Sequence, residues 1–457
     1  MNKRTKPVGD LQELKGFLDK YPHTRFIDAV FVDLCGVVRG KRFPRDDLEK
    51  IFTTGVQLPH STYLLDVTGH CNDPGGRGVS DGDPDGTGVP VSGTLAPCPW
   101  MDEPTGQVLM TMYDDDGTPS LLDPRNLAAR VVERLSELNL TPVIAFELEF
   151  YLLDRERDAH GRPQAPISAL TGERERMTQV FGLAELEGHA KFLSEVQRVA
   201  GLQNVPASVA TTEFAPGQYE INLRHNDAPL IAADHCALFR RLVKSVASHH
   251  GLDATFMSKP FADMTGNGMH IHLSLLDDSG ANVFDDGSRL GSKRLRHAVG
   301  GMMATMSESF AICAPNINAY RRFQPDVFVP VSKSWGPNNR SVAFRVPAGD
   351  TKNRRIEHRI AGAEANPYLV LAAVLAGAHY GLVNKIDAGP PSERNVCATV
   401  DPDLPLEWGR ALDRLERAEI LTSYIGQEYI SLYCATKRGE MRKFNQHLSP
   451  LEYEWYL

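Results

Sequence analysis

The chain has 457 residues, 42% hydrophobic and 23% charged, which is enough for a large buried core divided over two or three domains. Its formal net charge of -9 disfavours nonspecific nucleic-acid binding, which requires Lys and Arg side chains that neutralise phosphates. No run of about 18 apolar residues stands out, and the basic N-terminus lacks the apolar core of a signal peptide, so we expect no membrane span. Seven scattered cysteines without a C-x-x-C pair predict neither disulfides nor a thiolate zinc site, as in a reduced cytoplasm.

The first region, residues 1–117, is predicted to be a small N-terminal domain rich in short strands. Residues 26–40, FIDAVFVDLCGVVRG, alternate and then break at glycines, as a β-hairpin does. The stretch 73–91 is rich in Gly, Asp and Pro, so we expect an irregular loop there. Residues 107–119, QVLMTMYDDDGTP, then close the region with a strand and a turn.

The second region, residues 118–457, is predicted to be a large α+β domain. Asp123 and Pro124 have the character of a helix N-cap and a first helical residue, and apolar residues follow at helical spacing over 126–139. Strands and helices alternate from there onward. The candidate strands span residues 142–153, 213–225, 268–276, 341–349 and 354–360, and the candidate helices include 232–251, 295–314 and 366–386.

Polar side chains recur at alternate positions of these otherwise apolar strands. Residues two apart project from one face of a strand. A single pair of this kind is most often the solvated face of a sheet, but four segments with apolar flanks predict faces that converge on an interior. The residues are Glu147 and Glu149, His270 and His272, Arg355, Glu357 and Arg359, and the pair Glu213 and Glu220 on either side of a Pro-Gly turn.

So many buried carboxylates are costly unless a cation neutralises them. Carboxylates with one imidazole favour Mg²⁺ or Mn²⁺ over zinc, and the set is large enough for more than one ion. Such ions commonly hold phosphate oxygens, and the nearby Arg and Lys side chains suit phosphates and carboxylates. The residues alone therefore predict metal-dependent phosphoryl or acyl-phosphate chemistry. The cationic residues are Arg340, Arg345, Lys352, Arg354, Arg355 and Arg359.

In chain order and over nearly the whole length, these segments resemble the glutamine synthetase superfamily. VDLCGVVRGKRFP is similar to its β-grasp signature, and the catalytic blocks are matched by FELEFYL, EFAPGQYEINL, GNGMHIHLSL, NAYRRFQP, NNRSVAFRVP and RRIEHRIAGAEANPYL. The resemblance implies a β-grasp domain over 1–117 and a catalytic domain with a curved antiparallel sheet over 118–457. Within the superfamily, the chain is most similar to γ-glutamylputrescine synthetases and related γ-glutamyl-polyamine ligases.

The resemblance also implies ATP, two or three Mg²⁺ or Mn²⁺ ions per site, and a role for each matched residue. The metal near glutamate would be held by Glu149, Glu213 and Glu220, and the metal on the nucleotide phosphates by Glu147, His270 and Glu357. ATP would be contacted by His272, Ser274, Lys352 and Arg355, and glutamate by Gly266, Arg322 and Arg359. Arg340 would stabilise the γ-phosphoryl group during its transfer.

The implied reaction has two steps, in which glutamate attacks ATP to give γ-glutamyl phosphate and an amine then displaces phosphate. A protonated amine must first lose a proton to a base. By resemblance Asp66 is that base, assisted by Asp85, with Asp83 as the alternative assistant. These residues lie in the N-terminal domain, which in this family completes the active site of a neighbouring subunit. The implied assembly is a cytoplasmic dodecamer of two hexameric rings.

Two departures from the ammonia-using relatives concern the substrate pockets. Phe328 stands where those enzymes carry a flap glutamate that helps to bind ammonium, so we expect an apolar wall, extended by Trp335, that favours an alkylamine. The alternative is a flap tip that packs on itself. Thr265 replaces an asparagine near the glutamate backbone groups. The rival functions are an ammonia-using glutamine synthetase and a non-catalytic structural or regulatory paralogue, although a dead paralogue would normally lose metal ligands.

Overall fold

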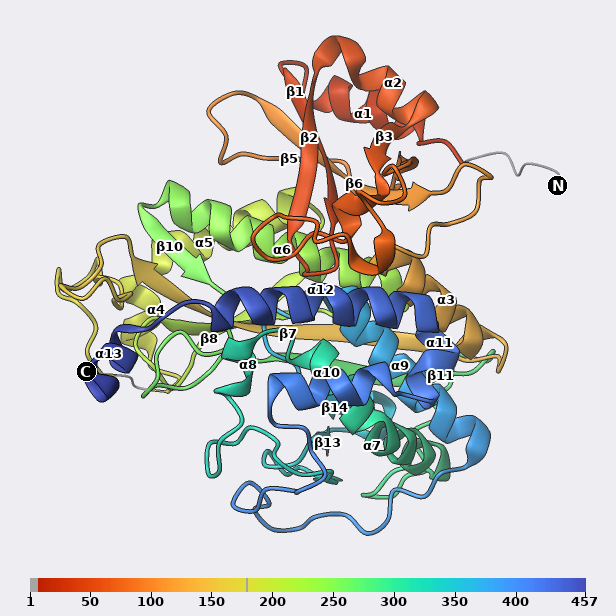
Figure 1. Ribbon diagram of the computed structural model, residues 1–457, viewed down its shortest axis with the longest axis vertical. Coiled ribbons are helices and arrows are strands. Elements are labelled where there is room, and N and C mark those ends of the chain that lie inside the picture. The colour runs from red at the N-terminus through yellow and green to blue at the C-terminus, as the bar shows by residue number, and fades with distance from the viewer. Residues whose placement is uncertain (1–6, 178–179) are drawn as a thin grey trace.

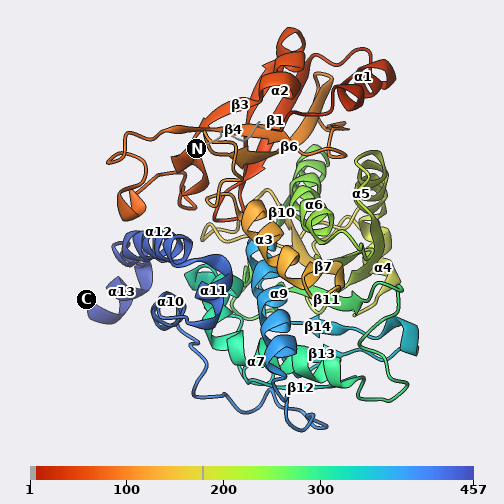
Figure 2. The ribbon, with the colours of Figure 1, turned by 90° about the vertical axis from the view of Figure 1, so that its right-hand side faces the viewer.

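The computed structural model describes residues 7–177 and 180–457, so the first six residues of the basic N-terminus lie outside the described part. Two sheets organise the chain, and Figures 1 and 2 show the N-terminal sheet as a separate layer above the remainder. The first sheet ends at Tyr113 and the second begins at Thr141, so the predicted domain boundary at residue 117 falls between them and stays a prediction. The expected α+β class is confirmed.

The N-terminal sheet has six strands in the order β2-β1-β6-β4-β3, with β5 paired to β6. Strands β1 and β2 form the predicted antiparallel hairpin, whose turn contains Gly36 at a φ of +77°. Its elements are α1 (Leu11–Lys20), β1 (Phe26–Val32), β2 (Val38–Pro44), α2 (Leu48–Thr54), β3 (Val56–Pro59), β4 (Asp85–Pro90), β5 (Ala96–Pro97) and β6 (Thr105–Tyr113).

The expectation of an irregular loop over 73–91 is wrong in its second half, because β4 occupies Asp85–Pro90. This strand lies between β3 and β6 and pairs with both. Gly86 is needed there, since a Cβ at this position would lie 2.8 Å from His60 Nε2 and from Met112 Sδ. Tertiary pairing therefore overrides a Gly- and Pro-rich composition that disfavours strands in isolation.

The second sheet has eight strands in the order β12-β13-β14-β11-β7-β9-β8, with β10 paired to β7. Its long central strand β7 buries every second side chain against helices and turns the alternate ones to the opposite face. The strands are β7 (Thr141–Asp154), β8 (Ala207–Thr212), β9 (Gln218–Leu223), β10 (Leu252–Thr255), β11 (Met269–Leu276), β12 (Trp335–Pro337), β13 (Phe344–Val346) and β14 (Ile356–His358).

Helices cover the buried face of this sheet, and α6 contacts both β7 and β10. The predicted N-cap Asp123 accepts a hydrogen bond from the Arg125 backbone N–H at 2.9 Å, at the start of the predicted helix. The helices are α3 (Pro124–Ser136), α4 (Leu183–Gly188), α5 (Ala190–Leu202), α6 (Pro229–His249), α7 (Lys293–Cys313), α8 (Ile317–Tyr320), α9 (Pro367–Asn384), α10 (Trp408–Glu416), α11 (Ile420–Ile425), α12 (Gln427–Asn445) and α13 (Pro450–Tyr456).

Helix α9 is apolar on all sides and lies in the core against α3, α6, α7 and α11. By length and composition it could cross a membrane, contrary to the expectation that no such run exists, but 78% of it is buried inside the protein. A helix that is hydrophobic all round is also what the centre of a large domain requires. Burial among other helices therefore accounts for its composition.

The contact between α7 and α9 depends on glycine. A Cβ at Gly301 would collide with the backbone of Gly377 and Gly381, and one at Gly381 would collide with the backbone of His297 and Gly301. Backbone atoms cannot move aside as a flexible side chain can. The close approach of these two helices therefore fixes how α9 sits beneath the sheet.

We expect Gly301→Ala to lower the free energy of unfolding by about 1–3 kcal/mol, because the added methyl forces the two helices apart. Gly16→Ala is the matched control, since Gly16 lies inside α1 with nothing within 4 Å of an added Cβ. It should stabilise the protein by roughly 0.5–1 kcal/mol. Denaturant unfolding measures both, and equal effects would contradict the glycine contact.

Candidate active site

The register of four neighbouring strands brings the predicted acidic and imidazole residues to one face of the second sheet. His270 on β11 lies opposite Glu147 on β7, and Glu149 on β7 lies opposite Glu220 on β9. On the other side of β11, Glu357 on β14 lies opposite His272. Residues directly opposite one another have neighbouring side chains. Strand pairing thus collects residues that are 210 positions apart (147 to 357) into one cluster.

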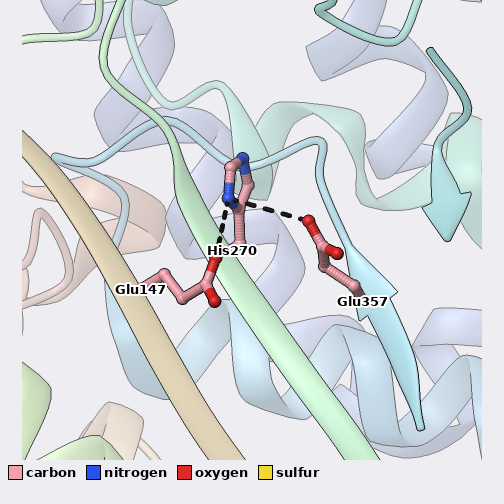
Figure 3. A group of neighbouring side chains, drawn as sticks. All are labelled: Glu147, His270 and Glu357. Atoms are coloured by element: carbon pink, nitrogen blue, oxygen red, sulfur yellow. Dashed lines mark hydrogen bonds and ion pairs between the residues drawn. The ribbon is translucent and has the colours of Figure 1, made fainter. Parts of the chain in front are cut away.

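Glu147, His270 and Glu357 form the first group of potential metal ligands, shown in Figure 3. The Nδ1 of His270 lies 3.3 Å from Glu147 Oε2 and 3.9 Å from Glu357 Oε1. Glu357 also forms an ion pair with Arg359 and lies 2.7 Å from Arg345. Burial opposes its ionisation, but Arg359 and His272 lower the pKa of Glu357 to about 2. This carboxylate is therefore ionised.

Glu149, Glu220 and His270 form the second group, with one ligand atom from each within 4.8 Å of the others. Burial, followed by the charges of Glu147 and Glu149, raises the pKa of Glu220 to about 9. Burial and Glu149 likewise raise the pKa of Glu213 to about 8. These carboxylates repel one another more strongly than their surroundings compensate, which is the condition that a bound cation relieves.

The donor set fits Mg²⁺ or Mn²⁺. Carboxylate oxygens dominate, one imidazole is shared between the groups, and no cysteine lies among the ligands of either group. One oxygen of Glu149 accepts from the backbone N–H of Gly268 at 2.6 Å, which fixes the orientation of that carboxylate. In metal sites, the residues that bind the metal are commonly oriented by hydrogen bonds from groups that do not bind it.

A cavity of about 960 Å³ opens beside this cluster. Its wall includes every predicted metal ligand and every residue predicted to contact glutamate or the transferring phosphoryl group. The flap residue Phe328 also lines it. These residues are Glu147, Glu149, Glu213, Glu220, His270 and Glu357, together with Gly266, Arg322, Phe328, Arg340 and Arg359.

A second cavity, of about 800 Å³, contains all four residues predicted to contact ATP. Arg355 Nε lies 3.0 Å from His272 Nδ1, and His272 Nε2 lies 2.7 Å from Glu147. Glu147 and Asn222 line both cavities, and the Asn222 amide donates to Glu147 at 2.8 Å. The two cavities therefore adjoin at Glu147. The four residues are His272, Ser274, Lys352 and Arg355.

The predicted proton-transfer residues Asp66, Asp85 and Asp83 line neither cavity of the described chain. Asp66 is buried and accepts from Asn72 at 2.8 Å and from Lys443 of α12 at 2.6 Å. Burial opposes its ionisation, but these donors hold the pKa of Asp66 well below its usual range. Its role in catalysis stays a prediction that involves a neighbouring subunit.

Trp335 does not extend the apolar wall at Phe328, contrary to expectation. It is 1% exposed in β12, and its indole N–H donates to the carbonyls of Ala388 at 3.1 Å and Gly389 at 3.2 Å. A buried indole requires such an acceptor, which no sequence pattern reveals. The cavity wall is instead extended by Phe181 and Phe214, which are 65% and 60% exposed.

The sequence did not predict that Gln218 and Asn222 line the cavity. The sequence prediction also placed Arg354 in the phosphate-binding cluster. Arg354 donates to the Ser288 carbonyl at 2.9 Å and lines neither cavity. Gln218 accepts from Thr265 at 2.5 Å and donates to the Gly266 carbonyl at 3.0 Å. Gln218 and Asn222 lie on β9, each two residues from Glu220. This spacing places all three side chains on one face, and it could have predicted that they line the cavity.

The comparisons with known proteins agree with this geometry. Residues 121–456 match the glutamine synthetase catalytic domain, so the chain belongs to the glutamine synthetase family. It is 42% identical over 446 residues to the gamma-glutamylputrescine synthetase of Escherichia coli K12, covering 98% of this chain and 94% of the relative.

It is also 32% identical to a glutamate–isopropylamine ligase of a Pseudomonas species, with 97% of each chain covered. The structure of GmaS in complex with ADP superposes with a TM-score of 0.82 at 26% identity, over 96% of this chain and 98% of that one. The curled sheet and its helices are therefore of the glutamine synthetase type.

The raised pKa values predict how pH affects the metal-free protein. The pKa of Glu220 rises from 4.5 to about 9, so the folded state holds that proton more tightly than the unfolded chain does. This stabilising contribution is present below pH 4.5 and is lost as pH rises toward 9. Because metal ions compete with these protons, Mg²⁺ should raise the melting temperature about twice as much at pH 8.5 as at pH 6.

Thermal melts in EDTA and in Mg²⁺ measure this difference, and Glu220→Gln supplies the control because it removes the titrating group. The variant should lose part of the difference between the two pH values, because Glu213, whose pKa is raised to about 8, still titrates in that range. An equal Mg²⁺ effect at pH 6 and pH 8.5 in the native protein would contradict the assignment of Glu220 as a ligand.

Proposed function

We propose that this protein ligates the γ-carboxylate of glutamate to an organic amine, with ATP as the energy source and γ-glutamyl phosphate as the intermediate. The observation that carries the proposal is the junction of two cavities at Glu147, one suited to phosphates and the other to glutamate. Phosphoryl transfer requires the phosphate donor and the attacking carboxylate to be held next to each other and in line. The names of two relatives, a gamma-glutamylputrescine synthetase and a glutamate–isopropylamine ligase, support the proposal.

Arg322 and Arg359 would hold glutamate. Each guanidinium is largely buried, and the Nε of each is buried without a hydrogen-bond partner among the described residues. A carboxylate supplies the acceptor that such a donor lacks. Gly266 lets the Arg322 side chain pack against the backbone at this position, because a Cβ at Gly266 would collide with the Arg322 side chain and the Ser258 carbonyl.

On the nucleotide side, Lys352 and Arg355 would bind phosphate oxygens, and the His272 ring is held in place by Arg355 and Glu147. Arg340 is exposed in the glutamate cavity and would stabilise the phosphoryl group in transfer. Mg²⁺ or Mn²⁺ held by the two ligand groups would supply charge neutralisation for the phosphates.

The amine side of the cavity is apolar. Phe328 is 55% exposed and, like Phe181, adopts a left-handed φ, near +53° and +60°. Bulky residues rarely adopt this conformation, and such strain gathers at functional sites. With Phe214 they form a wall suited to an alkyl chain, while the exposed Asp263 and Asp326 line the same cavity and would attract a second ammonium group. We therefore favour a diamine such as putrescine.

The base for the amine would be Asp66 of a neighbouring subunit, assisted by Asp85 or Asp83, in a cytoplasmic dodecamer of two hexameric rings. The support is that Asp66 lies outside both active-site cavities formed by the described residues of its own chain. An ammonia-using glutamine synthetase remains the competing function, since relatives with that name are 32% identical to the chain. Phe328 disfavours it, because an apolar side chain stands where the ammonia-using relatives are expected to carry a glutamate that binds ammonium.

The first test is phosphate release with ATP, Mg²⁺ and glutamate across putrescine, butylamine, spermidine and ammonium. We expect turnover with putrescine to exceed that with butylamine, and ammonium to be poor. Glu357→Ala should reduce turnover by roughly a hundredfold or more while the oligomer persists in size-exclusion chromatography. Turnover with ammonium alone would contradict the proposed function, and an active Glu357→Ala variant would contradict the metal site.

Phe328→Glu tests the amine pocket. A carboxylate on the wall would favour a small cation over an alkyl chain, so kcat/KM for ammonium relative to putrescine should rise about tenfold, equivalent to about 1.4 kcal/mol. Phe328→Leu is the matched control and should keep the preference for putrescine. An unchanged preference in Phe328→Glu would show that Phe328 does not line the amine site.

A further inference from the structure

A third cavity, of about 460 Å³, lies where the N-terminal region meets the catalytic region. Within the described part of the chain, it shares no lining residue with the two active-site cavities. The N-terminal wall is the β1–β2 turn, residues 35–38, with Val67. The opposite wall comes from α6, β10 and α12.

Of the residues that the structure describes, four cationic side chains but only two carboxylates line this cavity, and both carboxylates already have partners. Glu440 lies 3.1 Å from the Lys437 ammonium. Glu364 accepts from Ser258 Oγ at 2.6 Å and from the Asn316 amide at 3.0 Å, and burial raises its pKa. The positive charge on the cavity wall therefore exceeds the negative charge.

Three cations of α6 carry the excess positive charge. Arg240 is buried and donates to the carbonyls of Ala363 at 3.0 Å and Ala365 at 2.9 Å. Over the described residues, neither Arg240 nor Lys244 forms an ion pair with a carboxylate. Arg241 contacts Asp28 at 3.1 Å, but Arg42 holds the same carboxylate at 2.7 Å, and the buried Nε of Arg241 has no partner among residues 7–177 and 180–457.

The rest of the lining is mostly apolar and includes Val37, Val38, Phe256, Met257 and Pro315. A pocket of apolar walls with a few convergent cations suits a small molecule that has an anionic head and an aliphatic body. We propose that this cavity binds a small aliphatic carboxylate, with its head on Lys244 and Arg241. A phosphate ion would leave the apolar wall without a partner.

This site is connected to the glutamate cavity through one segment of chain. Residues 359–364 contribute Arg359 to the glutamate cavity and Glu364 to the third cavity. The Ala363 N–H donates to the Asn267 carbonyl at 3.2 Å, next to Gly266. Arg240 holds the same segment from the other side, so a carboxylate bound beside Arg240 changes the affinity for glutamate.

The test is calorimetric titration of butyrate into the assembled protein with glutamate saturating, so that the glutamate cavity is already filled. Butyramide and butylamine are the neutral and cationic analogues, and inorganic phosphate is an anion without an aliphatic chain. We expect butyrate to bind with a Kd in the millimolar range and the three analogues to bind at least fivefold more weakly. Tighter binding of phosphate, or no heat with butyrate, would overturn the proposal.

Lys244→Gln should weaken butyrate binding at least fivefold, whereas Lys244→Arg should retain it within twofold. Lys191→Gln, an exposed lysine of α5 outside all three cavities, is the matched control and should leave binding unchanged. Butyrate should also shift the glutamate KM at least twofold more in the native protein than in Lys244→Gln. If butyrate instead competed at the glutamate cavity, the glutamate KM would shift equally in the native protein and in Lys244→Gln. That result would overturn the proposed coupling between the two cavities.

Discussion

Mutual repulsion among carboxylates on one sheet face is the constraint on which the rest of the structure depends. Glu147, Glu149, Glu213, Glu220 and Glu357 converge from three sequence segments, and two of them have pKa values raised to about 8 and 9. The fold tolerates this concentration because His270 and nearby guanidinium groups offset part of the charge. The part that is not offset is the driving force for cation binding.

The geometry of this cluster comes from strand pairing, and strand pairing depends in turn on the helices beneath. A shift of one residue between β7 and β11 would turn His270 to the buried face and remove it from both ligand groups. Apolar side chains on the buried face oppose such a shift. Glycine contacts between α7 and α9 set how closely the helices pack below, so parts of the chain remote from the substrates still position the ligands.

The cluster of acidic side chains and the α+β class could be predicted from sequence because alternation places Glu147 and Glu149 on one face whatever their partners are. The strand at Asp85–Pro90 could not, since its stability comes from β3 and β6 and not from its own residues. The same limit applies to Trp335, whose acceptors at residues 388–389 are distant in sequence. Phe181 and Phe214 carry no periodic signal, so only the fold brings them to the cavity wall.

Glu147 belongs to both active-site cavities, and this has a thermodynamic consequence. A nucleotide that changes the charge or position of this carboxylate changes the affinity of the adjoining cavity for glutamate. Because free energy is a function of state, glutamate must change nucleotide affinity by the same factor. A change at this one side chain would therefore alter the binding of the proposed nucleotide and of the proposed glutamate together.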